Sequence, residues 1–436
     1  MTASYAMDWL NLLGRSVHVV AGIAWIGASF YFIWLDNHLQ APRGREAPPE
    51  YRGREAPSES NAPAAAESGV DGELWAVHGG GFYHAQKYRT APPVLPARLH
   101  WFMWEAYTTL LSGLFLLAVV YYAQAELYMV DRSVADLSPG LAVAIGIAWI
   151  AGGWLVYDAL CRSPLGRNDR ALALVLALLC AGAAYALCHL FPGRAAFVHF
   201  GSMLGTIMVL NVFFIIIPGQ RALVAAAREG RPIDPAFGLR GKQRSVHNTY
   251  FTLPVVFTML ANHYAWIYGA AWNWVWLIAI SAAAALIRAF FVARHHGHAS
   301  PWPLLAAAAL LAGTAYGVRP RETSHASTAP PLTRVQAIMA ERCVACHAAS
   351  PRFQGLAAAP KGVELEQAVQ LTMHAARIRE QVASRAMPPG NVTGLTDSER
   401  AELIAWVDVV SDPVPEGAAP PGRGVPSGAG SNNARP

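Results

Sequence analysis

The chain has 436 residues, of which 54% are hydrophobic and only 14% are charged. A soluble globular domain carries roughly a quarter charged residues, so this composition excludes a single soluble globular protein. The formal net charge of +5 does not indicate a nucleic-acid partner, because a membrane protein reaches the same balance through Lys and Arg in its cytoplasmic loops. The composition predicts a protein embedded in a lipid bilayer.

Eight apolar stretches are long enough to cross a bilayer, which takes about 20 helical residues. The sixth and eighth stretches are the weakest, and the sixth contains Pro254, which removes one helix hydrogen bond. We therefore expect an all-α fold: a polytopic membrane helix bundle of about eight spans. The expected spans are approximately residues 9–35, 101–123, 141–160, 171–191, 196–217, 250–267, 272–292 and 303–318.

The loops between these stretches predict the orientation of the chain. Lys and Arg are concentrated in the odd-numbered loops, which the positive-inside rule assigns to the cytoplasm. Both termini then lie outside, which predicts a multi-pass protein of the bacterial inner (plasma) membrane with a periplasmic C-terminal domain. No cleavable signal peptide is expected, because the start lacks a basic region and its apolar run is too long.

Two segments are too poor in apolar residues to bury a core. Residues 41–72 are rich in Ala, Pro, Glu and Arg, and residues 413–436 are rich in Gly, Pro and Ala. We expect a disordered cytoplasmic insertion in the first and a disordered tail in the second. The domain prediction is a membrane domain over 1–320 and a periplasmic domain over 321–412.

Cys343-Val344-Ala345-Cys346-His347 is the strongest local signal in the sequence. The pattern Cys-x-x-Cys-His is typical of covalent c-type haem attachment, with the histidine as the proximal iron ligand. A zinc site or a thioredoxin-like motif would require a second Cys/His pair or a βαβ context, and the sequence has neither. We therefore predict one haem c.

The residues around this motif predict a small helical, class I-like cytochrome c domain. Residues 332–342 and 363–383 have the pattern of amphipathic helices, and Thr396 with Glu399 forms a capping box before a third. Met387 is the expected second iron ligand, with Met373 as the competing candidate. A Met/His pair raises the reduction potential, which suits an electron acceptor.

Ionisable side chains within membrane spans are costly and are often functional. By the predicted orientation, His18, His189, His199 and His263 lie in the outer half of four different spans. This pattern is typical of a bis-histidine haem b pocket, in which Arg15 could pair with a propionate. The alternative is that these histidines form hydrogen bonds between helices, and for any single one that alternative is favoured. A haem b held by His18, His199 and His263 is thus a second cofactor hypothesis.

On the inner side, Glu105 lies one turn into the second span, close to His100 and Arg98. The run Gly79-Gly80-Gly81 lacks the Lys and Ser/Thr of a phosphate-binding loop, so we expect a tight turn or a close approach of backbone to a ligand. A cytoplasm-facing pocket with basic residues, aromatic residues and a carboxylate would suit a planar organic anion.

Three motifs resemble a known family. They are Gly22-Ile23-Ala24-Trp25-Ile26-Gly27-Ala28-Ser29-Phe30, Leu99-His100-Trp101 running to Trp104-Glu105-Ala106-Tyr107-Thr108-Thr109, and Arg244-Ser245-Val246-His247-Asn248 followed by Thr252-Leu253-Pro254. These residues resemble the membrane-bound, cytochrome c-coupled urate oxidase (urate hydroxylase) family, over nearly the whole chain. The resemblance implies oxidation of urate to 5-hydroxyisourate in purine catabolism. It also implies that the electrons pass to the chain's own cytochrome rather than forming hydrogen peroxide.

This resemblance gives roles to particular residues as a hypothesis. Urate, largely a monoanion at neutral pH, would be held by basic and amide side chains while a carboxylate or a histidine accepts a proton. A soluble cytochrome or a terminal oxidase would then collect the electrons. The candidate catalytic residues are Glu105, His100 and His247, and the candidate substrate-binding residues are Arg98, Lys87, Arg244 and Asn248.

A weaker likeness links the first span, from His18 through Trp25 to His38, with membrane protoporphyrinogen oxidases that hold haem b. Three alternatives to urate oxidation stay open. The first is another membrane haem dehydrogenase, acting on a quinol or a different small anion. The others are a non-enzymatic electron carrier with membrane anchors and a transporter with an attached cytochrome.

Overall fold

The computed structural model describes residues 3–41, 69–89, 91–232, 234–295, 300–319, 329–353 and 356–411. The chain forms two compact units. Unit 1 contains residues 1–321, 355–357 and 384–394, and unit 2 contains residues 322–354, 358–383 and 395–436. The predicted tail over 413–436 and most of the predicted insertion over 41–72 lie outside the described residues.

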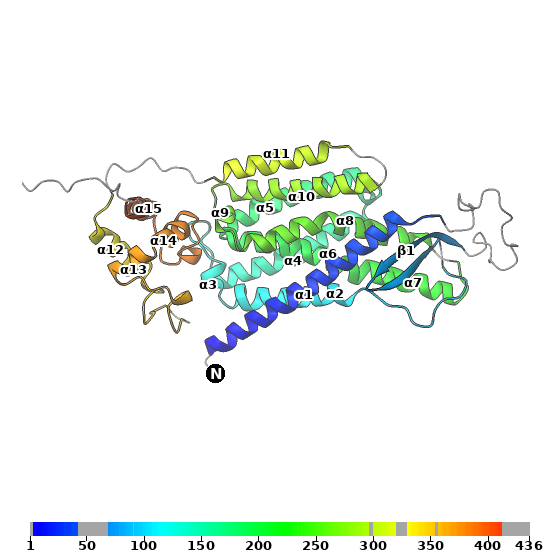
Figure 1. Ribbon diagram of the computed structural model, residues 1–436, viewed down its shortest axis with the longest axis horizontal. Helices are drawn as coiled ribbons and strands as arrows, with labels where there is room; N and C mark the ends of the chain where they lie inside the picture. The colour runs from blue at the N-terminus through cyan, green and yellow to red at the C-terminus, as the bar shows by residue number, and fades with distance from the viewer. Residues whose placement is uncertain are drawn as a thin grey trace, which may run out of the picture. The chain divides into compact units, whose positions relative to one another are not determined.

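In its described residues, unit 1 is a bundle of long helices with one β-hairpin (Figure 1). Its helices pack in a connected series, in which α6 contacts α4, α5 and α8, and α10 contacts α8 and α11. The elements are α1 (Ala3–His38), β1 (Val70–His78), β2 (Gly81–Tyr88), α2 (Trp104–Leu116), η2 (Leu117–Tyr122), α3 (Ala125–Tyr128), α4 (Pro139–Arg162), η3 (Pro164–Arg167), α5 (Asp169–Leu190), α6 (Gly193–Asn211), η4 (Val212–Ile216), α7 (Ile217–Arg228), α8 (Pro235–Ala261), α9 (Ala265–Tyr268), α10 (Asn273–His295) and α11 (Trp302–Gly317).

In the described part of the chain, six helices are long and apolar enough to cross a membrane, which indicates a multi-pass membrane protein. They are Trp9–His38, Trp104–Tyr122, Pro139–Arg162, Asp169–Leu190, Gly193–Arg228 and Asn273–Arg294, and they match six of the eight predicted spans.

The other two predicted spans are helical but do not meet the same criteria. Helix α8 carries Arg240, Lys242 and Arg244 in its first half, so its apolar stretch is short. Helix α11 has 16 residues, which rise about 24 Å and fall short of a hydrocarbon core of about 30 Å. Length and composition alone therefore support six spans.

Among the residues that the structure describes, two π-helical turns interrupt the long helices. η2 continues α2, and η4 joins α6 to α7, so that Gly193–Arg228 is one continuous helical rod. Each π turn adds one residue to a helical turn and often occurs at a functional site. Hydropathy gives no signal for such turns, and the sequence did not predict them.

The hairpin β1–β2 corrects the prediction of an all-α fold. Val70 pairs with Tyr88 at the open end, and His78 pairs with Gly81 beside the turn. Gly79 and Gly80 have backbone φ values of +57° and +80°, which residues other than glycine rarely adopt. The expected tight turn is therefore confirmed. The first strand begins at Val70, inside the segment predicted as a disordered insertion.

Unit 2 is a small helical unit with its own core. Its helices are α12 (Leu332–Arg342), η5 (Pro360–Gly362), α13 (Ala368–Met373), α14 (Ala375–Ala383) and α15 (Asp397–Ser411), while η6 (Pro389–Asn391) belongs to unit 1. The predicted helix over 332–342 is confirmed. The predicted helix over 363–383 begins later, at Ala368, and breaks at His374. Buried side chains such as Ile338, Leu371 and Leu403 form the core.

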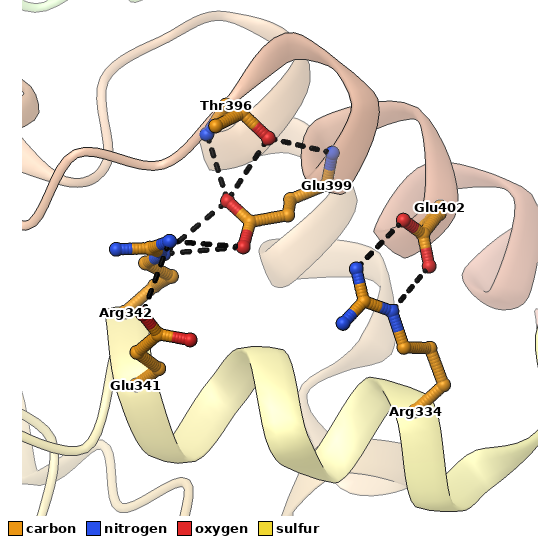
Figure 2. A network of polar contacts seen from close by, with 6 residues as sticks. All are labelled: Arg334, Glu341, Arg342, Thr396, Glu399 and Glu402. Atoms are coloured by element: carbon orange, nitrogen blue, oxygen red, sulfur yellow. Dashed lines mark hydrogen bonds and ion pairs between the residues drawn. The ribbon is translucent and has the colours of Figure 1, made fainter.

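Two arginines of α12 bind carboxylates of α15 (Figure 2). Arg334 makes a bidentate contact with Glu402, at 2.8 and 3.0 Å, and Arg342 contacts Glu399 at 3.1 Å. Glu399 also accepts hydrogen bonds from the backbone N–H and the hydroxyl of Thr396, which confirms the predicted capping box. These contacts hold the helix that precedes the Cys-x-x-Cys-His motif against the last helix of the unit.

Candidate active site

A cavity of about 1300 Å³ lies within unit 1, between α1, α2, α6, α7 and α8. Arg15 and Asp36 both line it, and they are about 30 Å apart along α1. The cavity therefore follows most of the length of this helix, and both π turns contribute residues to its wall. Its charged and imidazole side chains are Arg15, His18, Asp36, His100, Glu105, Arg194 and His263.

The cavity brings together some of the predicted site residues but not others. Those that line it are Arg15, His18, His100, Glu105, Asn248 and His263. Those that do not line it are Lys87, Arg98, His199, Arg244 and His247.

Glu105 lies in the first turn of α2 and faces the cavity. Its Oε2 atom is buried and has no hydrogen-bond partner among the described residues. A buried carboxylate oxygen without a partner is costly, so a ligand that donates a hydrogen bond would stabilise this arrangement. His100, four residues before α2 begins, also lines the cavity, and its ring packs edge-on against Phe102 at 4.6 Å.

Lys87 lies at the edge of the cavity rather than in its wall. Its Nζ atom is 2.9 Å from Oδ1 of Asp36, which lines the cavity at the end of α1. This ion pair ties strand β2 to α1, and both side chains are about half exposed. Arg98 is an exposed residue of the segment that precedes α2. Lys87 is therefore the predicted basic residue that the fold places beside the cavity.

A buried polar network extends from the cavity wall into the bundle. Asn211 is fully buried and donates from Nδ2 to Oδ1 of Asn248 at 2.9 Å and to Oη of Tyr157 at 3.0 Å. The Tyr157 hydroxyl is in turn hydrogen-bonded to Nδ1 of His247 at 2.8 Å. Asn248 alone among these residues lines the cavity.

Arg244 packs against this network on the side away from the cavity. It is buried, donates from Nη2 to Asp158 at 2.8 Å, and places its guanidinium 4.8 Å from the ring centroid of Tyr157. Asp158 also accepts from Arg162 at 2.6 Å. Arg244 and His247 thus contact the cavity through Tyr157, Asn211 and Asn248 rather than directly.

Two of the predicted haem b histidines have different surroundings. Nδ1 of His18 is 3.1 Å from the backbone carbonyl of Thr109, and its Nε2 has no hydrogen bond among the described residues. His199 is fully buried, with Nδ1 bonded to the carbonyl of Ala195 and Nε2 bonded to Tyr122. Both ring nitrogens of His199 are thus engaged, while His18 presents one nitrogen near the cavity.

Arg194 is a cavity residue that lies just outside the predicted span over 196–217. It lies in the first turn of α6, its guanidinium packs over Tyr121 and Tyr128 at 5.9 and 5.1 Å, and its Nε atom is buried without a partner. A cation beside an apolar span indicates a functional residue, and this signal was available in the sequence.

The Cys-x-x-Cys-His motif lies in unit 2, directly after α12. Cys343 caps this helix, and burial raises the pKa of its thiol to about 12, which favours a neutral sulfur. His347 donates from Nδ1 to the backbone carbonyl of Val363 at 2.8 Å, so Nε2 is the ring nitrogen that a haem iron would bind. Two cysteines and an oriented imidazole within five consecutive residues fit a covalently attached haem.

The second iron ligand stays a sequence prediction. Met387 belongs to the segment 384–394 of unit 1, and Met373 is an exposed residue at the end of α13 in unit 2. Among the described residues, no three His, Cys, Asp or Glu side chains converge to hold a bare metal ion.

Tyr157 and Asn211 are further residues that sequence reasoning missed. Asn211 is a polar residue in a long apolar run, which is a recognisable signal in a membrane span. Tyr157 gives no such signal, because tyrosines are common near span ends.

Comparison with known proteins identifies the membrane unit. No curated protein and no solved structure matches the chain. The urate oxidase N-terminal family matches residues 4–318, which cover all six candidate spans and more than half of the 436 residues. The chain therefore belongs to the urate oxidase N-terminal family.

Proposed function

We propose that this protein oxidises urate to 5-hydroxyisourate within its membrane unit and passes the electrons to a c-type haem on unit 2. The observation that carries the proposal is the presence of two parts in one chain. A urate oxidase N-terminal region covers residues 4–318, and Cys343, Cys346 and His347 follow it in a unit where the His347 imidazole is oriented for iron. When bound, the haem takes up one electron at a time.

The part of the cavity near Glu105 is the proposed urate site. Urate is flat and carries several N–H and C=O groups, so it needs acceptors, donors and positive charge. Glu105 offers a buried acceptor, and the Asn248 amide lies in the same cavity wall as a polar contact. Lys87, beside Asp36, supplies positive charge at the edge of the cavity.

The reaction balances without an oxygen co-substrate. Urate and one water give 5-hydroxyisourate, two protons and two electrons, and the water oxygen forms the new bond at C5. Glu105 accepts one N–H proton, with His100 as the second proton acceptor in the same cavity. The electrons leave singly toward the cytochrome, and a soluble cytochrome or a terminal oxidase collects them.

Arg244 and His247 are assigned positioning roles, because they contact Tyr157 rather than the cavity. The Asp158 pair fixes Arg244, and the chain of hydrogen bonds from His247 to Asn248 fixes the amide that faces urate. Arg98 is not part of the proposed site.

The same cavity is large enough for a second ligand. Pockets for one small molecule have about 300–1000 Å³, and urate is among the smallest such ligands. A haem b held by His18 would fit the free Nε2 nitrogen of that residue, with His263 as the other cavity histidine. His199 is omitted, because Tyr122 and Ala195 engage its ring. We place the protein in the bacterial inner membrane with unit 2 on the periplasmic side.

One experiment tests the proposed function. Urate is added without oxygen to membranes that contain the protein, and the α band of haem c is followed. We expect two equivalents of haem c to be reduced for each urate consumed, with 5-hydroxyisourate as the product. Reduction by a quinol with no response to urate would contradict the proposal and favour another membrane dehydrogenase. Membranes with the Cys343→Ser/Cys346→Ser variant provide the control.

A further inference from the structure

Two guanidinium groups line the cavity near His18. Arg15 lies one turn before His18 in α1, and Arg194 lies in the first turn of α6. The guanidinium of Arg194 lies 5.9 Å from the ring centroid of Tyr121 of η2, and this tyrosine lines the same cavity as both arginines. Residues far apart in the sequence therefore bring two positive charges to the same end of the cavity.

Neither guanidinium forms an ion pair with a carboxylate of the described residues. Arg15 donates to the side-chain oxygen of Asn11 at 2.6 Å, and the Nε atom of Arg194 is buried without a partner. Cations in a membrane unit are costly unless an anion or a polar cavity compensates them. Arg15 is exposed and Arg194 is partly buried, and neither has a carboxylate partner among the described residues, so both guanidinium groups are available to an anion in the cavity.

The rest of this region limits what the anion can be. The lining of the cavity is mainly small and apolar residues, among them Gly22, Val198 and Gly201, with hydroxyl and amide side chains such as Ser202, Thr206 and Asn262 between them. His18 adds an imidazole whose Nδ1 is held by the Thr109 carbonyl. A ligand for this space is flat and mainly apolar, carries two negative charges at one edge, and offers an atom that an imidazole can bind.

We propose that Arg15 and Arg194 form an anion-binding subsite for the two carboxylates of a metal-bearing tetrapyrrole, which occupies the cavity beside urate. This inference rests on the proposed function, because it places a cofactor in the same cavity in which urate is proposed to bind. Glu105 is one helical turn, about 6 Å, from Thr109, the residue that binds His18. The tetrapyrrole and the urate would therefore be neighbours in one cavity.

The subsite is tested by the haem composition of purified protein. Variants Arg15→Gln and Arg194→Gln are compared with Arg194→Lys, which keeps the charge, and with Arg132→Gln as a control. Arg132 is an exposed arginine outside the cavity, with 86% of its side chain accessible. A pyridine haemochrome spectrum gives the ratio of b-type to c-type haem, and phosphate analysis gives bound phospholipid.

We expect one b-type haem for each c-type haem in the natural protein and in the Arg132 control. The two Gln variants should lose most of the b-type haem while they keep the c-type haem, and Arg194→Lys should retain it. Full b-type haem with an unchanged midpoint potential in both Gln variants would overturn the subsite. A natural protein with c-type haem alone, or with phospholipid lost from the Gln variants instead, would also overturn it.

The same preparations separate this inference from the proposed function. If urate reduces haem c in a protein without b-type haem, the subsite fails and the proposed function stands. If the Gln variants lose b-type haem but urate never reduces haem c in the natural protein, the subsite stands and urate oxidation fails.

Discussion

Asn211 donates its side-chain amide to the side-chain carbonyl of Asn248 over 2.9 Å, from a position that is fully buried. This contact joins the wall of the cavity to the network of Tyr157 and His247. Removing a buried hydrogen-bond partner leaves the other group unsatisfied, which costs about 1–3 kcal/mol. This contact and the hydrogen bond from Nδ2 of Asn248 to the Met208 carbonyl, at 3.0 Å, together hold the Asn248 amide.

Asn211→Leu should raise the KM for urate about tenfold while kcat changes little, because the loss corresponds to roughly 1.4 kcal/mol of binding. Steady-state reduction of haem c by urate measures both constants. Tyr157→Phe keeps the Asn211–Asn248 contact and should have a smaller effect on KM. A fall in kcat of equal size in both variants, with KM unchanged, would contradict a positioning role.

Glu105→Gln should lower the rate of urate-driven haem c reduction by about 10²–10⁴-fold, because an amide cannot accept the proton. The rate is measured by stopped-flow absorbance in the absence of oxygen. Glu126→Gln is the matched control, since Glu126 is exposed in α3 and does not line the cavity. Unchanged turnover in Glu105→Gln would remove this carboxylate from the chemistry.

Lys87→Gln should raise the KM for urate up to about fivefold with kcat unchanged, because a half-exposed charge contributes about 1 kcal/mol or less. The effect should shrink at high salt, where the attraction between Lys87 and an approaching anion is screened. Arg89→Gln removes another charge of the hairpin, from a side chain that is 80% exposed and paired with Asp71. An equal effect of Arg89→Gln would show that only the total charge of the hairpin matters.

Cys343→Ser/Cys346→Ser should abolish covalently bound haem, which is detected by haem staining after a denaturing gel. Cys180→Ser is the control, because Cys180 lies in α5 within the membrane unit. Retention of the stain in the double variant would exclude the attachment site in unit 2.

Unit 2 should lose stability in acid through Glu399 and Glu402. Burial opposes ionisation of Glu399, but hydrogen bonds from Thr396 and Arg342 outweigh it and lower the pKa of this carboxyl below 4.5. A hydrogen bond from Arg334 lowers the pKa of Glu402 in the same way. A pKa that is lowered on folding stabilises the folded state above the unfolded pKa of 4.5, and this contribution is lost as pH falls through the folded pKa.

Circular dichroism during acid titration of the full chain would detect this loss in the natural protein and in a Glu399→Gln variant. The variant should be less stable than the natural protein at pH 7. Its stability should also change less than that of the natural protein as the pH falls below about 5. Identical acid profiles would show that the ion pair contributes nothing to the pH dependence.

The sequence by itself determined the parts of this protein that depend on local pattern. Six apolar helices, the helix over 332–342 and the capping box of Thr396 and Glu399 all follow from the order of neighbouring residues. Hydropathy was less reliable for α8, whose charged first half and apolar second half form one helix. Hydropathy did not predict the hairpin β1–β2, because nearly all of its side chains are exposed or only partly buried.

The tertiary structure decided which polar side chains share a site. Hydropathy places a residue in a helix, but it does not fix the rotation of that helix or its neighbours. The sequence grouped Arg244, His247 and Asn248 on one motif, yet only Asn248 lines the cavity. Arg15 and Arg194 meet there because α1 and α6 pack around one space, and no local pattern encodes that packing.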